Sequence, residues 1–414
     1  MEEFQWFVGI DWGSREHRFA LLDHTGRVHG RRTVAHTVTD LTQAFQWVCG
    51  QSGVPPAAIA VGVEVPHGVL VDASLEWGFA VFALNPKQTD RFRDRFTMAG
   101  AKDDARDAET IGDGLRTDRR AFRRLEPTDP AVVALRELAR LADDLTTELG
   151  RLSNRLRAQL YRVDAPWLQV CPAANEPWLW TLLKKTPDPA HWATLSRQHL
   201  TGILRRHRIR RLGADDLLAV VQQPRLSAAP GVAMAVRTRV ASLVPQLTLL
   251  QEQLRRTQRQ IDQALEQLAE GSDSEPTEHR DVAILQSLPG VGRMVTATML
   301  TETSGALSAR DYRTLTALAG AAPVTRQSGK CRYVHMRRAC NPRLRQALYH
   351  WARASLQRDA AARAFYDRHR QAGARHATAL RCLGARWLRI LVAMLKSQSL
   401  YDPARCPIAA VPAA

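Results

Sequence analysis

The chain has few cysteines, and none of them is spaced as a metal-binding or disulfide-forming pair. Its six cysteines are scattered over 414 residues without a Cys-x-x-Cys motif: Cys49, Cys171, Cys331, Cys340, Cys382 and Cys406. This argues against a zinc ribbon and against a disulfide framework, and it suits a reducing cytoplasm. Any metal that the protein binds is therefore expected to be a hard ion held by oxygen atoms.

Targeting and membrane segments are also missing from the sequence. The N-terminus, MEEFQWFVGIDWGS, begins with acidic residues and has no long apolar core of a secretory peptide. No run of apolar residues approaches the length that is needed to cross a bilayer. We therefore expect a cytoplasmic protein with no membrane partner.

Acidic residues are in the minority. Lysine and arginine number 58 against 41 aspartate and glutamate residues, which gives a formal net charge of +17. Because each phosphate that is neutralised by lysine or arginine releases a condensed counterion, such an excess predicts a nucleic-acid partner. A solvated basic surface is the alternative. Hydrophobic residues make up 45% of the chain, enough for an ordinary soluble core.

The first 125 residues alternate strand and helix signals and form the first expected domain. Three short apolar or alternating runs come first and indicate strands, and Asp40 is a favourable N-cap for the helix that follows. The expected strands are Phe7–Asp11, His17–Leu22, Arg27–Val34, Ile59–Val63 and Phe79–Leu84, and the expected helices are Asp40–Val48, His67–Trp77 and Ala105–Leu115. This order predicts a mixed sheet with helices on its faces.

Residues 126–278 have a different character. Leucines at spacings of three and four run from Leu135 to Leu160 and from Leu243 to Leu268, which predicts two long amphipathic helices in a coiled-coil or helical stalk. Residues 164–245 between them are rich in Trp, Pro and Arg and are expected to be a compact helical insertion. Its basic run, His199–Arg211, is either a solvated helix face or a phosphate-contacting surface. A mostly helical domain is expected at 279–400, followed by a tail at 401–414.

Four acidic residues in the first domain are candidates for a metal site. Asp11 and Glu64 each end an apolar strand, whereas Asp104 and Asp107 are spaced i and i+3 on one expected helix face. Carboxylates that lie close together need a cation, and oxygen ligands select Mg²⁺ or Mn²⁺, ions that can clamp the oxygens of a phosphoryl transfer. Taken singly, each acid is ordinary as a solvated or capping residue, and Asp103 is an alternative to Asp104.

The segment Leu288–Gly292 (LPGVG) lies between two expected helices. A glycine turn there exposes backbone N–H groups at a helix N-terminus, which suits a phosphate and resembles a helix-hairpin-helix element. The predicted contacts are made by Gly290 and Gly292. A plain turn between helices is the alternative.

Ser328 lies in a short turn within a strongly basic stretch. A serine before glycine is usually only a turn residue. Here guanidinium groups would bind a scissile phosphate, and a serine that attacks it would conserve the bond energy as a phosphoserine. The predicted nucleic-acid contacts around it are Arg326, Lys330, Arg332, Arg337, Arg338, Arg343 and Arg345.

These motifs together resemble the RuvC-like DEDD transposases of bacterial insertion sequences, relatives of the Piv DNA invertases. The match is carried by GIDWGS, VEVPHG and the acidic segment around Asp104 and Asp107, and by LPGVG, LAGAAPVTRQSGK and CNPRLRQALYHWA. It covers residues 1–120 and 280–360. The residue before the third acid, usually threonine, is Asp103 here, and a common glycine is Cys340. Neither departure removes a catalytic group.

The resemblance implies a ribonuclease H-like (RuvC-like) N-terminal domain, a coiled-coil dimerisation region and a C-terminal domain that carries the nucleophile. It assigns Asp11, Glu64, Asp104 and Asp107 to the metal site and Ser328 to the covalent step. It also implies donor and target double-stranded DNA, a non-coding bridge RNA, a homodimer that assembles to a tetramer, and a place with the bacterial nucleoid.

Three other functions compete with this one. A Holliday-junction nuclease would use only the carboxylates, so it would leave Ser328 unexplained. An actin-like ATPase or sugar kinase also has a GIDWGS-like first loop, but its second Asp-Gly-Gly phosphate loop is missing from the sequence. A non-catalytic RNA-binding scaffold would not need all four acids and the serine.

Overall fold

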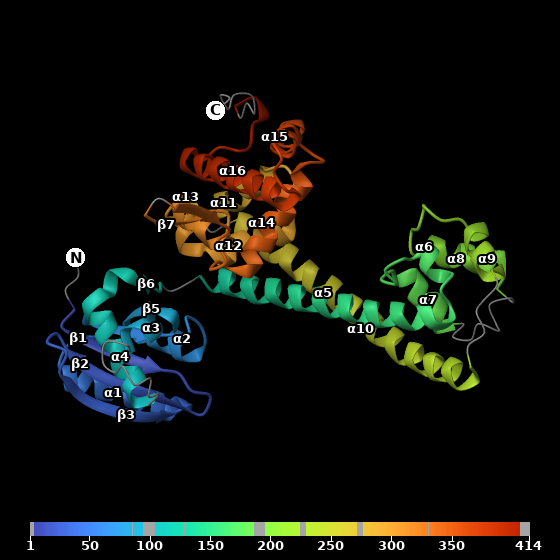
Figure 1. Cartoon of the computed structure of the whole chain (residues 1–414). Helices are drawn as coiled ribbons and strands as arrows, with labels where there is room; N and C mark the ends of the chain where they lie inside the picture. The colour runs from blue at the N-terminus through green and yellow to red at the C-terminus, as the bar shows by residue number, and fades with distance from the viewer. Residues whose placement is uncertain are drawn as a thin grey trace. The chain divides into compact units, whose positions relative to one another are not determined.

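The computed structural model describes residues 4–84, 86–93, 104–126, 129–185, 195–223, 229–270, 276–329 and 331–405. The chain divides into two compact units, Met1–Asp129 and Pro130–Ala414 (Figure 1). Each unit is described by itself below. No described helix is both long enough and apolar enough to span a membrane.

The N-terminal unit is built on a six-stranded mixed sheet with the strand order β3-β2-β1-β4-β5-β6. The first three strands pair antiparallel, β1, β4 and β5 pair parallel, and β6 is antiparallel to β5. The strands are β1 (Trp6–Asp11), β2 (Glu16–Asp23), β3 (Val28–Ala35), β4 (Ile59–Val63), β5 (Ala80–Ala83) and β6 (Arg123–Arg124). The predicted mixed sheet is confirmed, since hairpin strands come first and crossover connections follow.

Helices cover both faces of this sheet, because successive strand residues point to opposite sides. Leu41 and Phe45 of α1 pack on one face, whereas Ile111 and Leu115 of α4 pack on the other. The helices of this unit are α1 (Val38–Ser52), α2 (Val69–Glu76), α3 (Pro86–Arg93) and α4 (Asp104–Asp118). The predicted N-cap of α1, Asp40, was wrong. Thr37 caps the helix by accepting a hydrogen bond from the backbone N–H of Asp40 at 3.1 Å.

Two long helices, α5 (Pro130–Val163) and α10 (Pro230–Glu270), lie side by side in the second unit (Figure 1). Leu135 shares a core cluster with Leu265 near one end of the pair, and Leu156 shares another with Val244 and Leu247. The two predicted leucine-striped helices are therefore present, and they run antiparallel. Helix α10 begins within the stretch 164–245 that the sequence predicts as an insertion. Buried Val236, Val240 and Val244 extend the stripe, and α10 continues through Pro245.

Four short helices fill the region between α5 and α10, around the buried indoles of Trp167, Trp178 and Trp180. They are α6 (Trp167–Val170), α7 (Pro177–Lys185), α8 (Arg197–Arg206) and α9 (Ala214–Gln222). Exposed basic side chains gather at the end of α8 and just beyond it, at Arg205, Arg206, Arg208, Arg210 and Arg211.

The rest of the second unit is a helical body with one hairpin. Trp351 and Trp387 stack in its core, with ring centroids 5.9 Å apart. Its elements are α11 (Pro276–Ser287), α12 (Arg293–Ser308), α13 (Tyr312–Leu318), β7 (Val324–Ser328), β8 (Cys331–His335), α14 (Pro342–Ser355), α15 (Ala360–Gln371) and α16 (His376–Ser397). The expectation of a helical domain is confirmed, but the β7–β8 hairpin was not predicted.

Candidate functional site

Two of the predicted acids end neighbouring parallel strands. Ile10 of β1 is paired with Val63 of β4, so Asp11 and Glu64 occupy the next positions at the same edge of the sheet. Paired strands lie about 4.8 Å apart, which keeps these two positions close together. Both residues are partly buried. The prediction that strand ends bring these two acids together agrees with this register.

A glycine in β1 brings α4 and its Asp107 to this edge. A Cβ atom at Gly9 would lie 1.8 Å from the carbonyl oxygen of Ala108 and 2.5 Å from the backbone nitrogen of Gly112, so α4 crosses β1 in direct backbone contact. Asp107 precedes Ala108 on α4 and is only 5% exposed. The crossing therefore places Asp107 beside the C-terminal part of β1, the part that ends at Asp11.

The donor set fits a hard cation in its chemistry, since carboxylate oxygens are the ligands that Mg²⁺ prefers. Asp104 begins α4, but its side chain lies outside the described residues. Among the side chains that the structure describes, no three His, Cys, Asp or Glu residues stand close enough to hold an ion. Asp11, Glu64 and Asp107 are thus gathered by the backbone and do not by themselves form a closed ligand set.

His17 is a residue of this region that the sequence did not single out. It is fully buried, and its Nδ1 accepts a hydrogen bond from the backbone N–H of Gly13 at 3.4 Å. Its Nε2 lies 2.9 Å from Nδ1 of His36. Burial, and then the nearby His36, lower the pKa of His17, which favours the neutral ring that can accept this bond. His17 therefore anchors the loop that follows Asp11.

The glycine turn between α11 and α12 is present as predicted. Gly290 has a φ of +83°, and a Cβ atom there would lie 2.6 Å from the backbone nitrogen of Ser355. Trp351 also donates its indole N–H to the carbonyl oxygen of Pro289 at 3.2 Å. Packing against α14 is thus sufficient to require glycine at position 290.

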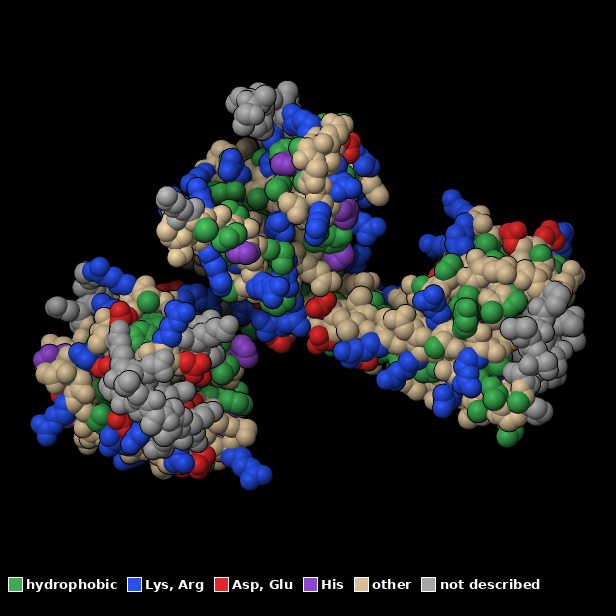
Figure 2. Space-filling view, viewed as in Figure 1, with side chains coloured by type: hydrophobic (Ala, Val, Ile, Leu, Met, Phe, Trp, Pro, Cys, Tyr) green, Lys and Arg blue, Asp and Glu red, His purple; other side chains and the backbone are tan. Residues whose placement is uncertain are grey.

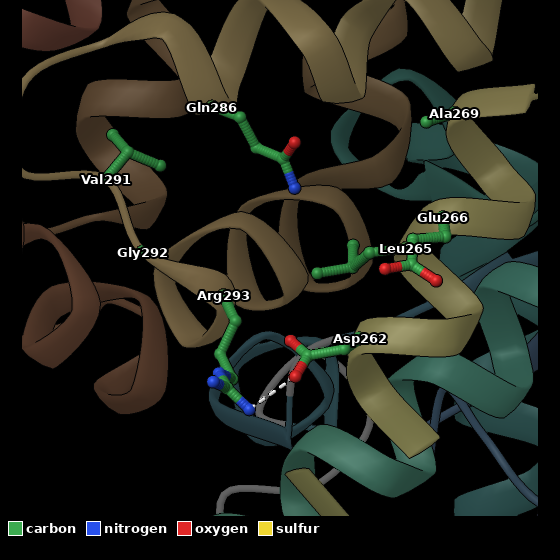
Figure 3. Close-up of a pocket in the computed structure, with 8 residues that line it drawn as sticks. All are labelled: Asp262, Leu265, Glu266, Ala269, Gln286, Val291, Gly292 and Arg293. Carbon is green, nitrogen blue, oxygen red and sulfur yellow. Dashed lines mark hydrogen bonds and ion pairs between the residues drawn. The ribbon is translucent and has the colours of Figure 1, made fainter. Parts of the chain in front are cut away.

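Gly292, the N-cap of α12, borders a shallow pocket whose lining includes two carboxylates (Figure 3). Arg293 points across this pocket to Asp262 of α10, and their side chains are 2.6 Å apart. Glu266 lies one helical turn further along α10. Carboxylates beside the turn disfavour a phosphate. The predicted phosphate contacts of Gly290 and Gly292 stay a prediction.

Ser328 is the last residue of β7 and directly precedes Gly329 in the short turn of the hairpin. It pairs with Cys331 of β8 across the tip of the hairpin. Ser328, Arg326 and Arg332 are all exposed. Lys330 lies outside the described residues.

The other predicted basic residues differ in their surroundings. Arg343 forms ion pairs with Asp143 and Asp144 of α5 at 3.3 and 3.4 Å, and Arg337 is partly buried. Arg338 and Arg345 are exposed. Figure 2 shows lysine and arginine side chains spread over the visible surface of the helical body and along the two long helices. Charge alone therefore does not single out one nucleic-acid-binding surface.

The Asn-Pro-x-Leu-Arg part of the C-terminal motif has a structural role. The side-chain oxygen of Asn341 caps α14 by accepting hydrogen bonds from the N–H groups of Arg343 and Leu344. Its amide nitrogen donates to Glu302 of α12 at 2.7 Å, and Glu302 also receives a bond from Arg140 of α5 at 3.1 Å. Asn341 thereby joins three helices.

The two motif-bearing regions coincide with two known family domains. Residues 8–163 match a DEDD transposase family of the IS110 type, and residues 282–367 match the family described as Transposase IS116/IS110/IS902. The IS117 mini-circle protein of Streptomyces coelicolor, named as a transposase, is 31% identical over 96% of both chains. This chain belongs to the IS110-type transposase family. The resemblance found in the sequence is thus confirmed.

Two further relatives of this transposase family member differ in their coverage. A Sinorhizobium fredii protein named as a transposase, y4uE, is 46% identical over 50% of this chain and 58% of its own length. The IS900 insertion-element protein of Mycobacterium paratuberculosis is 30% identical over 98% of this chain and 99% of its own. The match to the second of these relatives thus extends over nearly the whole of both chains.

Proposed function

We propose that this IS110-type transposase cleaves and exchanges DNA strands through a carboxylate metal site and a nucleophilic serine. The observation that supports the proposal is the register that puts Asp11 and Glu64 at neighbouring strand ends, with α4, which carries Asp104 and Asp107, crossing β1 in backbone contact. The strand order and the acids at its central strands agree with a ribonuclease H-like, RuvC-like domain.

The covalent step is assigned to Ser328. Its Oγ attacks the phosphorus of a DNA phosphodiester and loses its proton to solvent or a base, while one bridging deoxyribose oxygen leaves and takes up a proton. The phosphoserine keeps the bond energy, so attack by a deoxyribose hydroxyl of another strand releases Ser328 and reseals the DNA. Asp11, Glu64, Asp104 and Asp107 would hold Mg²⁺ or Mn²⁺, which supplies Lewis-acid stabilisation of the phosphoryl oxygens.

The partners in this proposal are donor and target double-stranded DNA, a bridge RNA and further copies of the chain. The formal charge of +17 supports a polyanionic partner. The bridge RNA, the homodimer and its tetramer are carried by the family resemblance. Sequencing the nucleic acid that copurifies with the full chain tests the RNA component, because a single abundant non-coding RNA is expected.

The cleavage test uses a supercoiled plasmid that carries the joined ends of the encoding element, incubated with the full-length protein and its copurified nucleic acid. Asp11→Asn, Glu64→Gln and Ser328→Ala should each abolish cleavage while nucleic-acid binding persists, since none of them removes a positive charge. Asp72→Asn, which alters an exposed acid on α2, is the matched control and should cleave normally. Full cleavage by an acid variant, or by the wild type in excess chelator, would contradict the metal site.

The same assay separates the proposal from a Holliday-junction nuclease. A covalent protein–DNA adduct that survives denaturation and disappears in Ser328→Ala is expected only for the serine mechanism. Cleavage by Ser328→Ala without an adduct would favour the nuclease. Binding without cleavage by the wild type would favour a scaffold.

A further inference from the structure

The β7–β8 hairpin is exposed on both of its faces. Every described residue of the two strands is exposed except Val324, which is partly buried. Tyr333 and Val334 retain 60% and 61% of their accessible surface, and Met336 just beyond β8 retains 47%. An isolated two-stranded hairpin is only marginally stable in water. Large apolar side chains on such a hairpin indicate a surface that contacts a partner.

The register of the hairpin divides its side chains into two sets. Ser328 is opposite Cys331, and Arg326 is opposite Tyr333. Because side chains alternate along a strand and directly paired residues share a face, these four lie on one face of the hairpin. We call it the serine face. Gln327 is opposite Arg332, and Thr325 is opposite Val334, so these residues occupy the other face.

Position on the hairpin therefore distinguishes arginines that have the same charge. Arg326 is two residues from Ser328 along β7, a rise of about 6.8 Å on the same face. The long arginine side chain spans that separation, and its planar fork matches two phosphate oxygens. Arg332 is nearer to the tip of the hairpin, but its side chain leaves the opposite face.

We propose that Arg326 binds the non-bridging oxygens of the phosphate that Ser328 attacks, and that Tyr333 packs against the neighbouring sugar or base. This inference rests on the proposed function, because it takes Ser328 as the nucleophile. Neither residue forms a covalent bond. Arg326 stays protonated and stabilises the charge on the phosphoryl group, whereas Tyr333 supplies a flat apolar surface that orients the strand.

The arginine test compares Arg326→Ala with Arg332→Ala in the full-length protein and the plasmid assay above. The rate of adduct formation is measured at saturating DNA, and DNA binding is measured separately. Loss of one donor to a developing charge typically lowers a rate by about 100-fold to 1,000-fold. We expect a loss of this size for Arg326→Ala and partial recovery in Arg326→Lys. For Arg332→Ala, a predicted nucleic-acid contact on the other face, we expect weaker DNA binding without a comparable loss of the rate at saturating DNA.

The tyrosine test uses an equally exposed neighbour as its control. Tyr333→Ala should lower the adduct rate about 10-fold or more, because stacking on a base contributes about 1–3 kcal/mol. Tyr333→Phe should keep the rate, and Val334→Ala on the other face should not change it. Since all these side chains are exposed, thermal unfolding of each variant should match the wild type.

The possible outcomes separate the two levels of the proposal. Equal losses of adduct rate for Arg326→Ala and Arg332→Ala would overturn the assignment of phosphate binding to the serine face. Equal losses for Tyr333→Ala and Val334→Ala would assign the hairpin's apolar residues to protein docking. If the wild type forms no adduct, or if Ser328→Ala still forms one, the nucleophile assignment fails first.

Discussion

Glu302 connects three helices of the second unit, and its removal tests whether that connection stabilises α14. Its carboxylate accepts hydrogen bonds from Arg140 and Asn341, and its side chain in the ion pair with Arg140 is 11% exposed. Each hydrogen bond to a charged group contributes about 1.5–3 kcal/mol, and relief of the buried charge offsets part of the loss. We expect Glu302→Ala to cost about 2–4 kcal/mol in the opening free energy of α14.

Hydrogen exchange of the full chain, followed by mass spectrometry, measures the opening free energy of α14 separately from that of other helices. At about 1.4 kcal/mol for each factor of ten, the amides of α14 should exchange at least about 25-fold faster in Glu302→Ala. Glu137→Ala is the matched control, since Glu137 also pairs with Arg140 but is 67% exposed. Exchange in α14 that changes by less than twofold, or equally in both variants, would refute the reasoning.

The pH dependence of this connection follows from the same contacts. Burial alone would raise the pKa of Glu302, but the hydrogen bonds from Asn341 and Arg140 outweigh it and hold that pKa below its usual value of 4.5. A lowered carboxyl pKa gives a stabilisation that is fully present above the unfolded pKa and is lost as the pH falls through the folded one. The difference in exchange between wild type and Glu302→Ala should therefore shrink below pH 4.5.

Three further predictions follow from the structure. Gly9→Ala should lower the unfolding temperature of the N-terminal unit markedly, because its Cβ would meet the backbone of α4, whereas Gly50→Ala on open helix surface should leave it unchanged or raise it slightly. If the acids and the serine of one site come from different copies of the chain, mixing the inactive variants Asp11→Ala and Ser328→Ala should produce a covalent DNA adduct on the Asp11→Ala protomer. Verified mixed oligomers that form no adduct would contradict a shared site. The logarithm of nucleic-acid affinity should fall linearly with the logarithm of salt concentration. The slope should become shallower when five exposed arginines are neutralised together, and an unchanged slope would show that they are only solvated. These arginines are Arg205, Arg206, Arg208, Arg210 and Arg211.

The regular elements with strong hydrophobic periodicity were predictable from the sequence. β4 is buried at all five positions, and the leucine stripes of α5 and α10 follow the helical repeat. The β7–β8 hairpin was missed because its sequence, VTRQSGKCRYVH, has no alternation of apolar and polar residues. Its exposure on both faces is the physical reason for that missing pattern.

Residues of the candidate site were predictable only where a local sequence pattern indicates their position. Asp11 and Glu64 follow apolar strands, and that position alone indicates a sheet edge. His17 gave no such signal, because its role depends on contacts with Gly13 and His36 that only folding creates. The link between Glu302 and Asn341 spans 39 residues and has no periodic signature.

For some residues of the motifs, packing alone explains why that residue type is needed, and for others it does not. Gly9 and Gly290 lie against backbone atoms of α4 and α14, and Asn341 caps α14, so the fold would require them without any catalysis. Ser328 and Arg326 are exposed on a hairpin that has no core of its own, and nothing among the described residues makes either of them necessary for stability. A substitution that unfolds the chain therefore reports on the first group. Under the proposed function, a substitution that leaves the fold intact and stops strand exchange should fall in the second group, because that proposal gives those two side chains their role on the nucleic acid.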